Sequence, residues 1–198
     1  SGGHTQIWIV KNNNSYTVVA NTVDDAAGEA FDKGARILGL KYPGGPEIEK
    51  KALNGDYKKY PFTIPEVKLN RFNFSFSGLK TALLYKIKEM DDDYKTDNLH
   101  HIASSYQEAI VDTLLSRIDR ISKEEKINDI SIAGGVAANT RFRDKANMLS
   151  IRRDLNIYFP PMNLCTDNAG MIAIAGHEKL SNNLSSNLDL EARPNLSL

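Results

Sequence analysis

The sequence predicts an α/β fold in which a mixed β-sheet is flanked by helices. Short runs rich in β-forming residues alternate with longer segments in which apolar residues recur at helical spacing. Along the chain these segments give a hairpin, a helix, an inserted segment, a helix, a strand, a helix, a strand and a last helix. This order is typical of α/β proteins.

Length and composition set broad limits. The chain has 198 residues, of which 41% are hydrophobic, enough for one or two domains with a real core. The 25 basic residues balance the 25 acidic ones, so any RNA contact would have to be a local patch. Cys165 is the only cysteine, which rules out an intrachain disulfide and favours a cytoplasmic location. We expect neither a membrane span nor a signal peptide.

The first part of the chain predicts a hairpin and a helix. Residues 6–11 and 16–20 are rich in β-formers, and the asparagines between them are turn residues. Asp24 and Asp25 are expected to start the helix, because carboxylates favour its positive N-terminus. The apolar residues at helical spacing are Ala27, Ala30, Phe31, Gly34, Ile37 and Leu38.

A helical insertion is predicted at about residues 46–97. It contains a short helix at 47–53 after a Pro-Gly-Gly-Pro turn, a loop at 56–75 and a helix at 79–90. The loop ends in Phe72, Phe74 and Phe76, whose alternation with polar residues predicts an extended segment with aromatic side chains in the core. The acidic run 91–93 is interpreted as a solvated loop.

Basic residues in the loop allow two interpretations. Lys58, Lys59, Lys68 and Arg71 form either an RNA-facing surface or an ordinary solvated loop, and the lack of aromatic platforms at matched spacing favours the second. Six other basic residues are candidate phosphate contacts, although ordinary surface positions explain them better: Lys50, Lys51, Arg141, Arg143, Arg152 and Arg153.

The longest helix is predicted at residues 98–123, capped by Thr96 or Asp97. His100 and His101 are adjacent, so on a helix they point about 100° apart and cannot both face one metal. We interpret both as surface or helix-start residues.

The last part of the chain alternates strands with helices. Strands are predicted at 127–133 and 157–159, with a helix at 139–149 between them. Thr166 is expected to cap a last helix from Asp167 to about Leu180. This helix is apolar almost all round and so requires cover on more than one side.

The strand–turn–helix stretch at residues 131–139 is the best candidate for a binding site. Gly134 and Gly135 lack a Cβ, so a ligand can approach their backbone closely. The helix that follows has unpaired N–H groups, which favour phosphate or other polar ligands. One such turn is weak evidence, but three similar ones occur at 1–4, 43–46 and 165–168. Their convergence would build a nucleotide cleft.

Six motifs in this order resemble one family, the tRNA threonylcarbamoyladenosine synthases of the TsaD/Gcp/Kae type. They are Ser1–Thr5, Asp24–Lys33, Tyr42–Pro46, Phe74–Thr81, Ala133–Asn139 and Cys165–Asn168. The resemblance runs from Ser1 to about Arg193 and covers the C-terminal two-thirds of the family's bacterial or organellar form.

The resemblance implies a ribonuclease H-like lobe of the actin, sugar-kinase and heat-shock ATPase superfamily. Residues 1–160 would form the second lobe, with the helical insertion at about 46–97. Residues 161–198 would form a helix and tail that pack on the first lobe.

The resemblance also implies an acyltransferase reaction. The threonylcarbamoyl group of threonylcarbamoyl-AMP would pass to the adenosine 3′ of the anticodon in tRNAs that read codons beginning with adenine. One divalent metal ion, iron or zinc, would polarise the acyl group as a Lewis acid. The implied partners are tRNA, a TsaB-type scaffold and a TsaE-type ATPase.

Site residues are implied position by position. Ser1, Gly2 and Gly3 resemble the loop around the phosphate and carbamoyl group. Asp32 and Gly45 resemble ribose contacts, although the pattern alone makes Asp32 an ordinary solvated helix acid. Glu49 stands where many relatives place an Asp. Gly134, Gly135 and Asn139 resemble the adenine pocket, and Asp167 resembles the carboxylate metal ligand.

The chain departs from the family pattern at the metal site. The family also uses two histidines of a His-x-x-x-His segment, and none of His4, His100, His101 and His177 matches it. We therefore expect a fragment without the first lobe, inactive alone, weak in metal binding and prone to self-association through its last helix. A sugar- or acetate-kinase-like protein and a non-catalytic scaffold paralogue are the alternatives.

Overall fold

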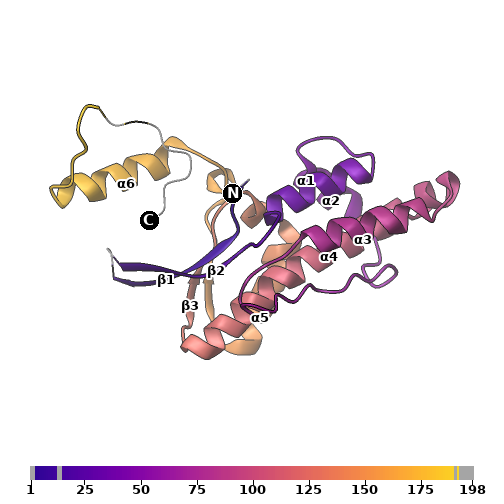
Figure 1. Ribbon diagram of the computed structural model, residues 1–198, viewed down its shortest axis with the longest axis horizontal. Helices are drawn as coiled ribbons and strands as arrows, with labels where there is room; N and C mark the ends of the chain where they lie inside the picture. The colour runs from indigo at the N-terminus through magenta and orange to yellow at the C-terminus, as the bar shows by residue number, and fades with distance from the viewer. Residues whose placement is uncertain (1–2, 13–14, 190, 192–198) are drawn as a thin grey trace.

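The computed structural model describes residues 3–12, 15–189 and 191, and it is an α/β structure with two small sheets (Figure 1). Its elements in chain order are β1 (Gln6–Asn12), β2 (Ser15–Asn21), α1 (Ala27–Ile37), α2 (Gly44–Ala52), α3 (Ser77–Lys88), α4 (Asp92–Glu125), β3 (Asp129–Ser131), the 3₁₀ helix η1 (Gly135–Ala138), α5 (Thr140–Arg153), β4 (Asn156–Tyr158), the 3₁₀ helix η2 (Met162–Leu164) and α6 (Ala169–Ser181).

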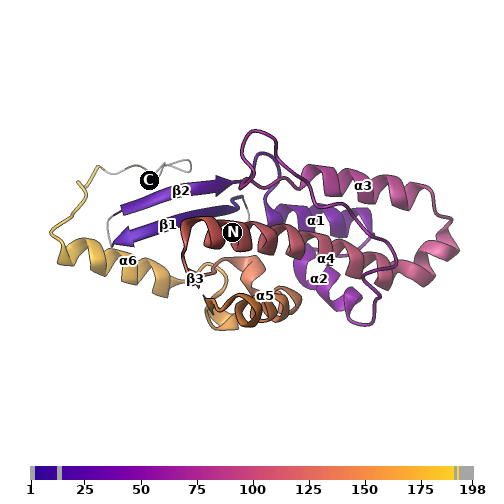
Figure 2. The same cartoon turned by 90° about the horizontal axis from the view of Figure 1, so that it is seen from below.

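The long helix α4 runs through the part of the molecule that contains α1, α2, α3 and α5 (Figures 1 and 2). In Figures 1 and 2 its first half lies beside α2 and α3, while its second half lies beside α5. Tyr106 on α4 is buried, and its hydroxyl donates a hydrogen bond of 2.9 Å to the carbonyl oxygen of Ala30 on α1. Gly34 is required beneath that ring, since an added Cβ would lie 2.2 Å from Tyr106 Cε1.

In the described part of the chain, the strands form two separate two-stranded sheets. β1 pairs with β2 antiparallel, which confirms the predicted hairpin, and β3 pairs with β4 parallel. The prediction of one mixed sheet is therefore wrong for these strands. A cavity of ≈760 Å³ lies between β1 and β3, and consecutive residues of both strands line it. Because consecutive residues of a strand point to opposite faces of its sheet, a cavity lined by consecutive residues lies along the edge of that strand. The edges of β1 and β3 therefore face each other across this cavity.

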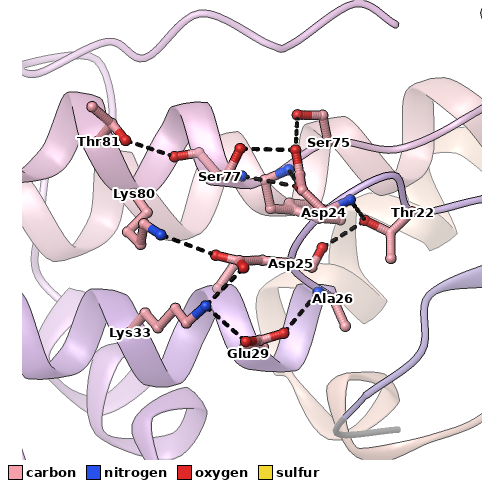
Figure 3. Close-up of polar contacts among 12 residues, drawn as sticks. Thr22, Asp24, Asp25, Ala26, Glu29, Lys33, Ser75, Ser77, Lys80 and Thr81 are labelled. Carbon is pink, nitrogen blue, oxygen red and sulfur yellow. Dashed lines mark hydrogen bonds and ion pairs between the residues drawn. The ribbon is translucent and has the colours of Figure 1, made fainter.

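The start of α1 differs from the prediction, because Asp24 and Asp25 precede the helix and bind elsewhere. The Asp24 carboxylate accepts hydrogen bonds from Ser75 Oγ (2.6 Å), the Phe76 N–H (2.7 Å), and the N–H (3.1 Å) and Oγ (2.8 Å) of Ser77 (Figure 3). Asp24 thus satisfies the unpaired amides at the start of α3.

Asp25 connects the same region to two cations. Its carboxylate lies 2.7 Å from Lys33 Nζ on α1 and 3.5 Å from Lys80 Nζ on α3 (Figure 3). The two aspartates therefore join the end of the hairpin to both helices. The prediction of an extended segment with Phe72, Phe74 and Phe76 in the core is confirmed for Phe74 and Phe76, which are buried, whereas Phe72 lies in a turn and is half-buried.

The start of α4 was also predicted wrongly. The helix begins at Asp92, and the Asp91 carboxylate accepts a hydrogen bond of 2.7 Å from the Tyr94 N–H. The acidic run is not a solvated loop, because a carboxylate at the N-cap and others in the first turn stabilise a helix start. His100 and His101 consequently lie within the helix and are half-buried, and His101 Nδ1 accepts a hydrogen bond from the Asp56 N–H.

The last helix, α6, extends away from the rest of the molecule (Figure 1). It begins at Ala169 with Asn168 as its cap, not Thr166, and none of its residues is buried. Ile172 is 70% exposed and Ile174 is 68% exposed. The apolar faces for which the sequence pattern requires cover are therefore uncovered in this chain. The division into two parts at residue 160 stays a prediction.

No helix among the described residues is both long enough and apolar enough to span a membrane.

The Asp24 contacts predict an acid-dependent contribution to stability. Burial raises the pKa of Asp24, but the hydrogen bonds from Ser75, Phe76 and Ser77 outweigh burial and hold the pKa below its ordinary value. This contribution is present above the pKa of the unfolded chain and is lost as the pH falls through the folded-state pKa. Asp24→Asn should lower the free energy of unfolding by about 1–2 kcal/mol at neutral pH, a value reduced by the exposure of Asp24.

Urea unfolding between neutral and acidic pH measures this difference. The wild-type chain should lose its advantage over Asp24→Asn as the pH falls. Asp144→Asn, at an exposed carboxylate on α5, is the control and should unfold like the wild-type chain. A constant gap between wild type and Asp24→Asn at every pH would contradict the assignment.

Candidate functional site

The glycine turn follows β3 and leads into η1. Gly134 has a φ of 95°, a conformation that glycine adopts without strain. Gly135 is exposed, and an added Cβ there would meet nothing within 4 Å. The backbone of this turn is therefore open to a ligand. The predicted helix does not follow the glycine turn directly, because residues 135–138 form the separate 3₁₀ helix η1 and α5 begins at Thr140.

Asn139 and Glu49 together hold the start of α5. Asn139 Oδ1 accepts a hydrogen bond of 2.9 Å from the Phe142 N–H, and its Nδ2 donates one of 2.8 Å to Gln107 Oε1 on α4. Glu49 Oε1 on α2 accepts a hydrogen bond of 2.7 Å from the Thr140 N–H. Both site candidates thus have a structural partner.

Asp32 has a similar role at α2. Its Oδ1 accepts a hydrogen bond of 2.7 Å from the Gly44 N–H, the first residue of that helix. Asp32 also borders a shallow pocket of ≈290 Å³, whose other lining residues are Lys33, Arg36, Leu40, Lys41 and Tyr42. The predicted site acid therefore lies at a helix start and at the rim of a pocket.

The two glycines that follow Pro43 are not equivalent. A Cβ on Gly44 would lie 2.6 Å from Asp32 Cα and 2.7 Å from Ala35 Cβ, so close packing of α2 on α1 requires this glycine. A Cβ on Gly45 would meet only Phe31 Cβ, at 4.0 Å. Gly45 is thus dispensable for packing and leaves space above the backbone.

These contacts bring most of the predicted site residues to one region. α1 contacts both α2 and η1, and Glu49 joins α2 to α5. Asp32, Gly45, Glu49, Gly134, Gly135 and Asn139 therefore surround the starts of α2, η1 and α5. Gly3 is exposed and precedes His4, which lines the cavity that Ala133 and Val136 also line. Ser1 and Gly2 lie outside the described residues.

Asp167 lies exposed just before α6. Among the described residues, no group of three His, Cys, Asp or Glu side chains is placed to hold a metal ion. One carboxylate offers too few donors for tight binding of iron or zinc. The described residues by themselves do not fit the implied metal, and we derive no chemical step through it.

A charged cluster that was not predicted from the sequence lies behind the start of α5. Glu108 on α4 is buried, and its carboxylate accepts two hydrogen bonds from Arg141, of 2.7 and 2.8 Å, and one of 2.5 Å from Lys145. Lys145 also pairs with Asp112. Burial raises the pKa of Glu108, but the hydrogen bonds from both cations outweigh it and hold the pKa below its ordinary value.

Two of the basic residues interpreted as surface positions are therefore structural. Arg141 and Arg143 are half-buried and hydrogen-bonded within the protein. One feature of the sequence could have indicated the charged cluster: Gln107 and Glu108 are two polar residues between apolar positions of a long helix. The loop residues Lys59 and Arg71 also bind within the protein, to Asn98 and Glu124.

The starts of α2 and α5 lie in the same region as the glycine turn, and the side chains of Asp32, Glu49 and Asn139 satisfy amides at both helix starts. A family model described as "TsaD: tRNA N6-adenosine threonylcarbamoyltransferase" matches residues 1–174. The chain belongs to this family.

Similar proteins have the same description. The chain is 50% identical to a tRNA N6-adenosine threonylcarbamoyltransferase of Thermosipho africanus and 48% identical to one of Thermotoga neapolitana, in each case over 100% of the chain and 59% of the relative. It is 42% identical to one of Cytophaga hutchinsonii over 99% of the chain and 57% of the relative. The chain thus spans about three-fifths of these curated relatives.

The charged cluster predicts a large effect of a small substitution. Glu108→Gln keeps the shape of the side chain but leaves Arg141 and Lys145 without their shared carboxylate. It should lower the free energy of unfolding by about 2 kcal/mol, the value of hydrogen bonds between charged groups in a buried site. Urea unfolding at neutral pH measures the loss. Asp97→Asn, an exposed position on α4, is the control and should change little. Equal stability of both variants would show that the cluster contributes nothing.

Proposed function

We propose that the chain is the nucleoside-binding part of a tRNA N6-adenosine threonylcarbamoyltransferase. The substrates are threonylcarbamoyl-AMP and tRNA, and the acceptor is the adenosine 3′ of the anticodon in tRNAs that read codons beginning with adenine. One observation supports this most directly: residues inside the family match, far apart in sequence, surround the starts of α2, η1 and α5.

The described residues would bind and orient the AMP half of the donor. Asp32 Oδ1 holds α2, which leaves Oδ2 to accept hydrogen bonds from ribose hydroxyls. The uncovered backbone at Gly45 and Gly135 admits the flat nucleoside. Asn139 and Glu49 keep η1 and α5 in place, and Gly134 supplies the turn. Ser1, Gly2 and Gly3 would surround the phosphate and carbamoyl group.

In the reaction, the exocyclic amine of adenosine attacks the carbamoyl carbonyl carbon. The bond from that carbon to the phosphate oxygen breaks, AMP leaves with the electron pair, and the amine loses a proton. The chain's contribution is orientation, which makes the attack effectively intramolecular. Asp167 is proposed as a metal ligand only together with donors from other parts of a longer protein.

The same reasoning makes the 198-residue chain inactive alone, with partners of the TsaB and TsaE type acting on the longer protein in the cytoplasm. We also propose that the chain has the ribonuclease H-like lobe structure of actin-like proteins. Two observations support the proposal that the chain acts as part of a longer protein: it spans 59% of its relatives, and the apolar helix α6 is uncovered.

The two glycines of α2 test the nucleoside site. Gly45→Ala should leave stability unchanged or raise it by up to about 1 kcal/mol, because alanine favours helix, yet weaken AMP binding by about tenfold through steric contact with the nucleoside. Gly44→Ala should instead destabilise the chain by about 1–3 kcal/mol through overpacking against α1. Calorimetric titration with AMP and thermal unfolding separate the two effects. Unchanged AMP affinity in Gly45→Ala would argue against this site.

The transferase assignment is tested in the intact gene. Asp167→Ala should abolish threonylcarbamoyladenosine in tRNA when the variant gene is expressed in a strain lacking the enzyme, because a metal bound by the longer protein would lose the carboxylate proposed as its ligand. Mass spectrometry of tRNA nucleosides measures the product. Asp189→Ala, in the exposed segment after α6, is the control and should support normal modification. Full modification with Asp167→Ala would remove Asp167 from the site.

Self-association through α6 is the remaining proposal. An uncovered apolar helix favours contact with a second copy, so light scattering should show the mass rising with concentration. Replacing Ile172 and Ile174 by lysine should return the chain to a monomer. A wild-type chain that stays monomeric at high concentration would contradict this.

A further inference from the structure

Arg143, in the first turn of α5, is the centre of a contact set that the proposed reaction does not use. Its Nε donates a hydrogen bond of 2.7 Å to the Ala137 carbonyl oxygen. Its Nη2 donates to the Pro160 carbonyl oxygen at 2.7 Å and to Cys165 Sγ at 3.2 Å. The guanidinium carbon lies 4.8 Å from the centroid of the Phe159 ring. One half-buried cation therefore has four partners.

These partners belong to three separate segments. Ala137 is in η1, directly after the glycine turn. Pro160 follows the strand β4, and Cys165 follows η2, two residues before Asp167. Cys165 is 2% exposed, so the end of η2 is anchored in the interior. Arg143 thus connects the proposed nucleoside turn to the segment that leads to Asp167.

Only arginine can make this set of contacts. Its planar guanidinium presents donors in a fixed fork and can lie over an aromatic ring at the same time. Lysine has a single ammonium on a flexible chain, so it can reach one carbonyl but cannot reproduce the planar arrangement. Loss of the guanidinium leaves the Ala137 and Pro160 oxygens without these donors, and η1 is then free to move relative to η2.

We propose that Arg143 is a positioning residue: by bonding η1 and the Pro160–Cys165 segment to one group, it fixes the nucleoside turn without touching the nucleoside. This inference rests on the proposed function for its ligand. The bond between the two segments does not depend on any ligand and can be measured separately.

The first measurement is calorimetric titration of the 198-residue chain with AMP. Arg143→Lys and Arg143→Met should each weaken AMP binding by about tenfold, the effect of losing one charge-assisted hydrogen bond network that holds the site. Arg152→Met, at an exposed arginine on the same helix, is the matched control and should bind AMP normally. Wild-type AMP affinity in both Arg143 variants would overturn the proposal.

The second measurement is amide hydrogen exchange without nucleotide. In the wild-type chain the Ala137 N–H donates to Gly134 and the Leu164 N–H donates to Pro161. Exchange at both amides should increase together in Arg143→Met, while amides in the middle of α4 keep their wild-type rates. Unchanged exchange at η1 and η2, or an equal increase throughout the chain, would overturn the positioning role. Failure of the wild-type chain to bind AMP would overturn the proposed function, and the exchange rates would still decide whether Arg143 connects the two segments.

Discussion

The start of α5 is the constraint on which the site depends. Its first amides are satisfied by side chains from two other parts of the chain, Glu49 on α2 and Asn139 at the cap. Gln107 on α4 then holds the Asn139 amide from behind. Because unpaired amides at a helix start are costly when they are covered, these contacts fix α2, α4 and α5 relative to one another. The glycine turn comes shortly before α5 in the chain, so these contacts also hold the turn in place.

Charged side chains hold many of the loops and helices in place, because the sheets are small. β3 and β4 have three residues each, so strand pairing alone offers few hydrogen bonds to hold the loops that follow. Glu108 with its two cations, and Arg117, which is fully buried and donates to the Asn73 and Pro65 carbonyl oxygens, bind loops and helices to α4 instead. Buried charges are stable only when paired, so each of these contacts also selects one arrangement.

The chain has one well-packed part and one uncovered part. The residues from α1 to α5 share a single apolar core, whereas no residue of α6 is buried. This uncovered apolar helix is the basis of the proposed self-association. The proposed transferase accounts for both parts, since the relatives are longer than this chain.

The sequence by itself determined the elements whose signal is local: the hairpin, the apolar stripe of α1, the helix α5, two of the three phenylalanines predicted in the core and the glycine turn. Its ordered motifs also determined the family. Only the tertiary structure showed that Asp24 caps α3, 52 residues away, and that Glu49 caps α5, 91 residues away. It also separated the predicted mixed sheet into two and gave Glu108 and Arg143 their partners. Periodicity reports which face of an element is buried, but a polar side chain's partner is set by how distant elements pack.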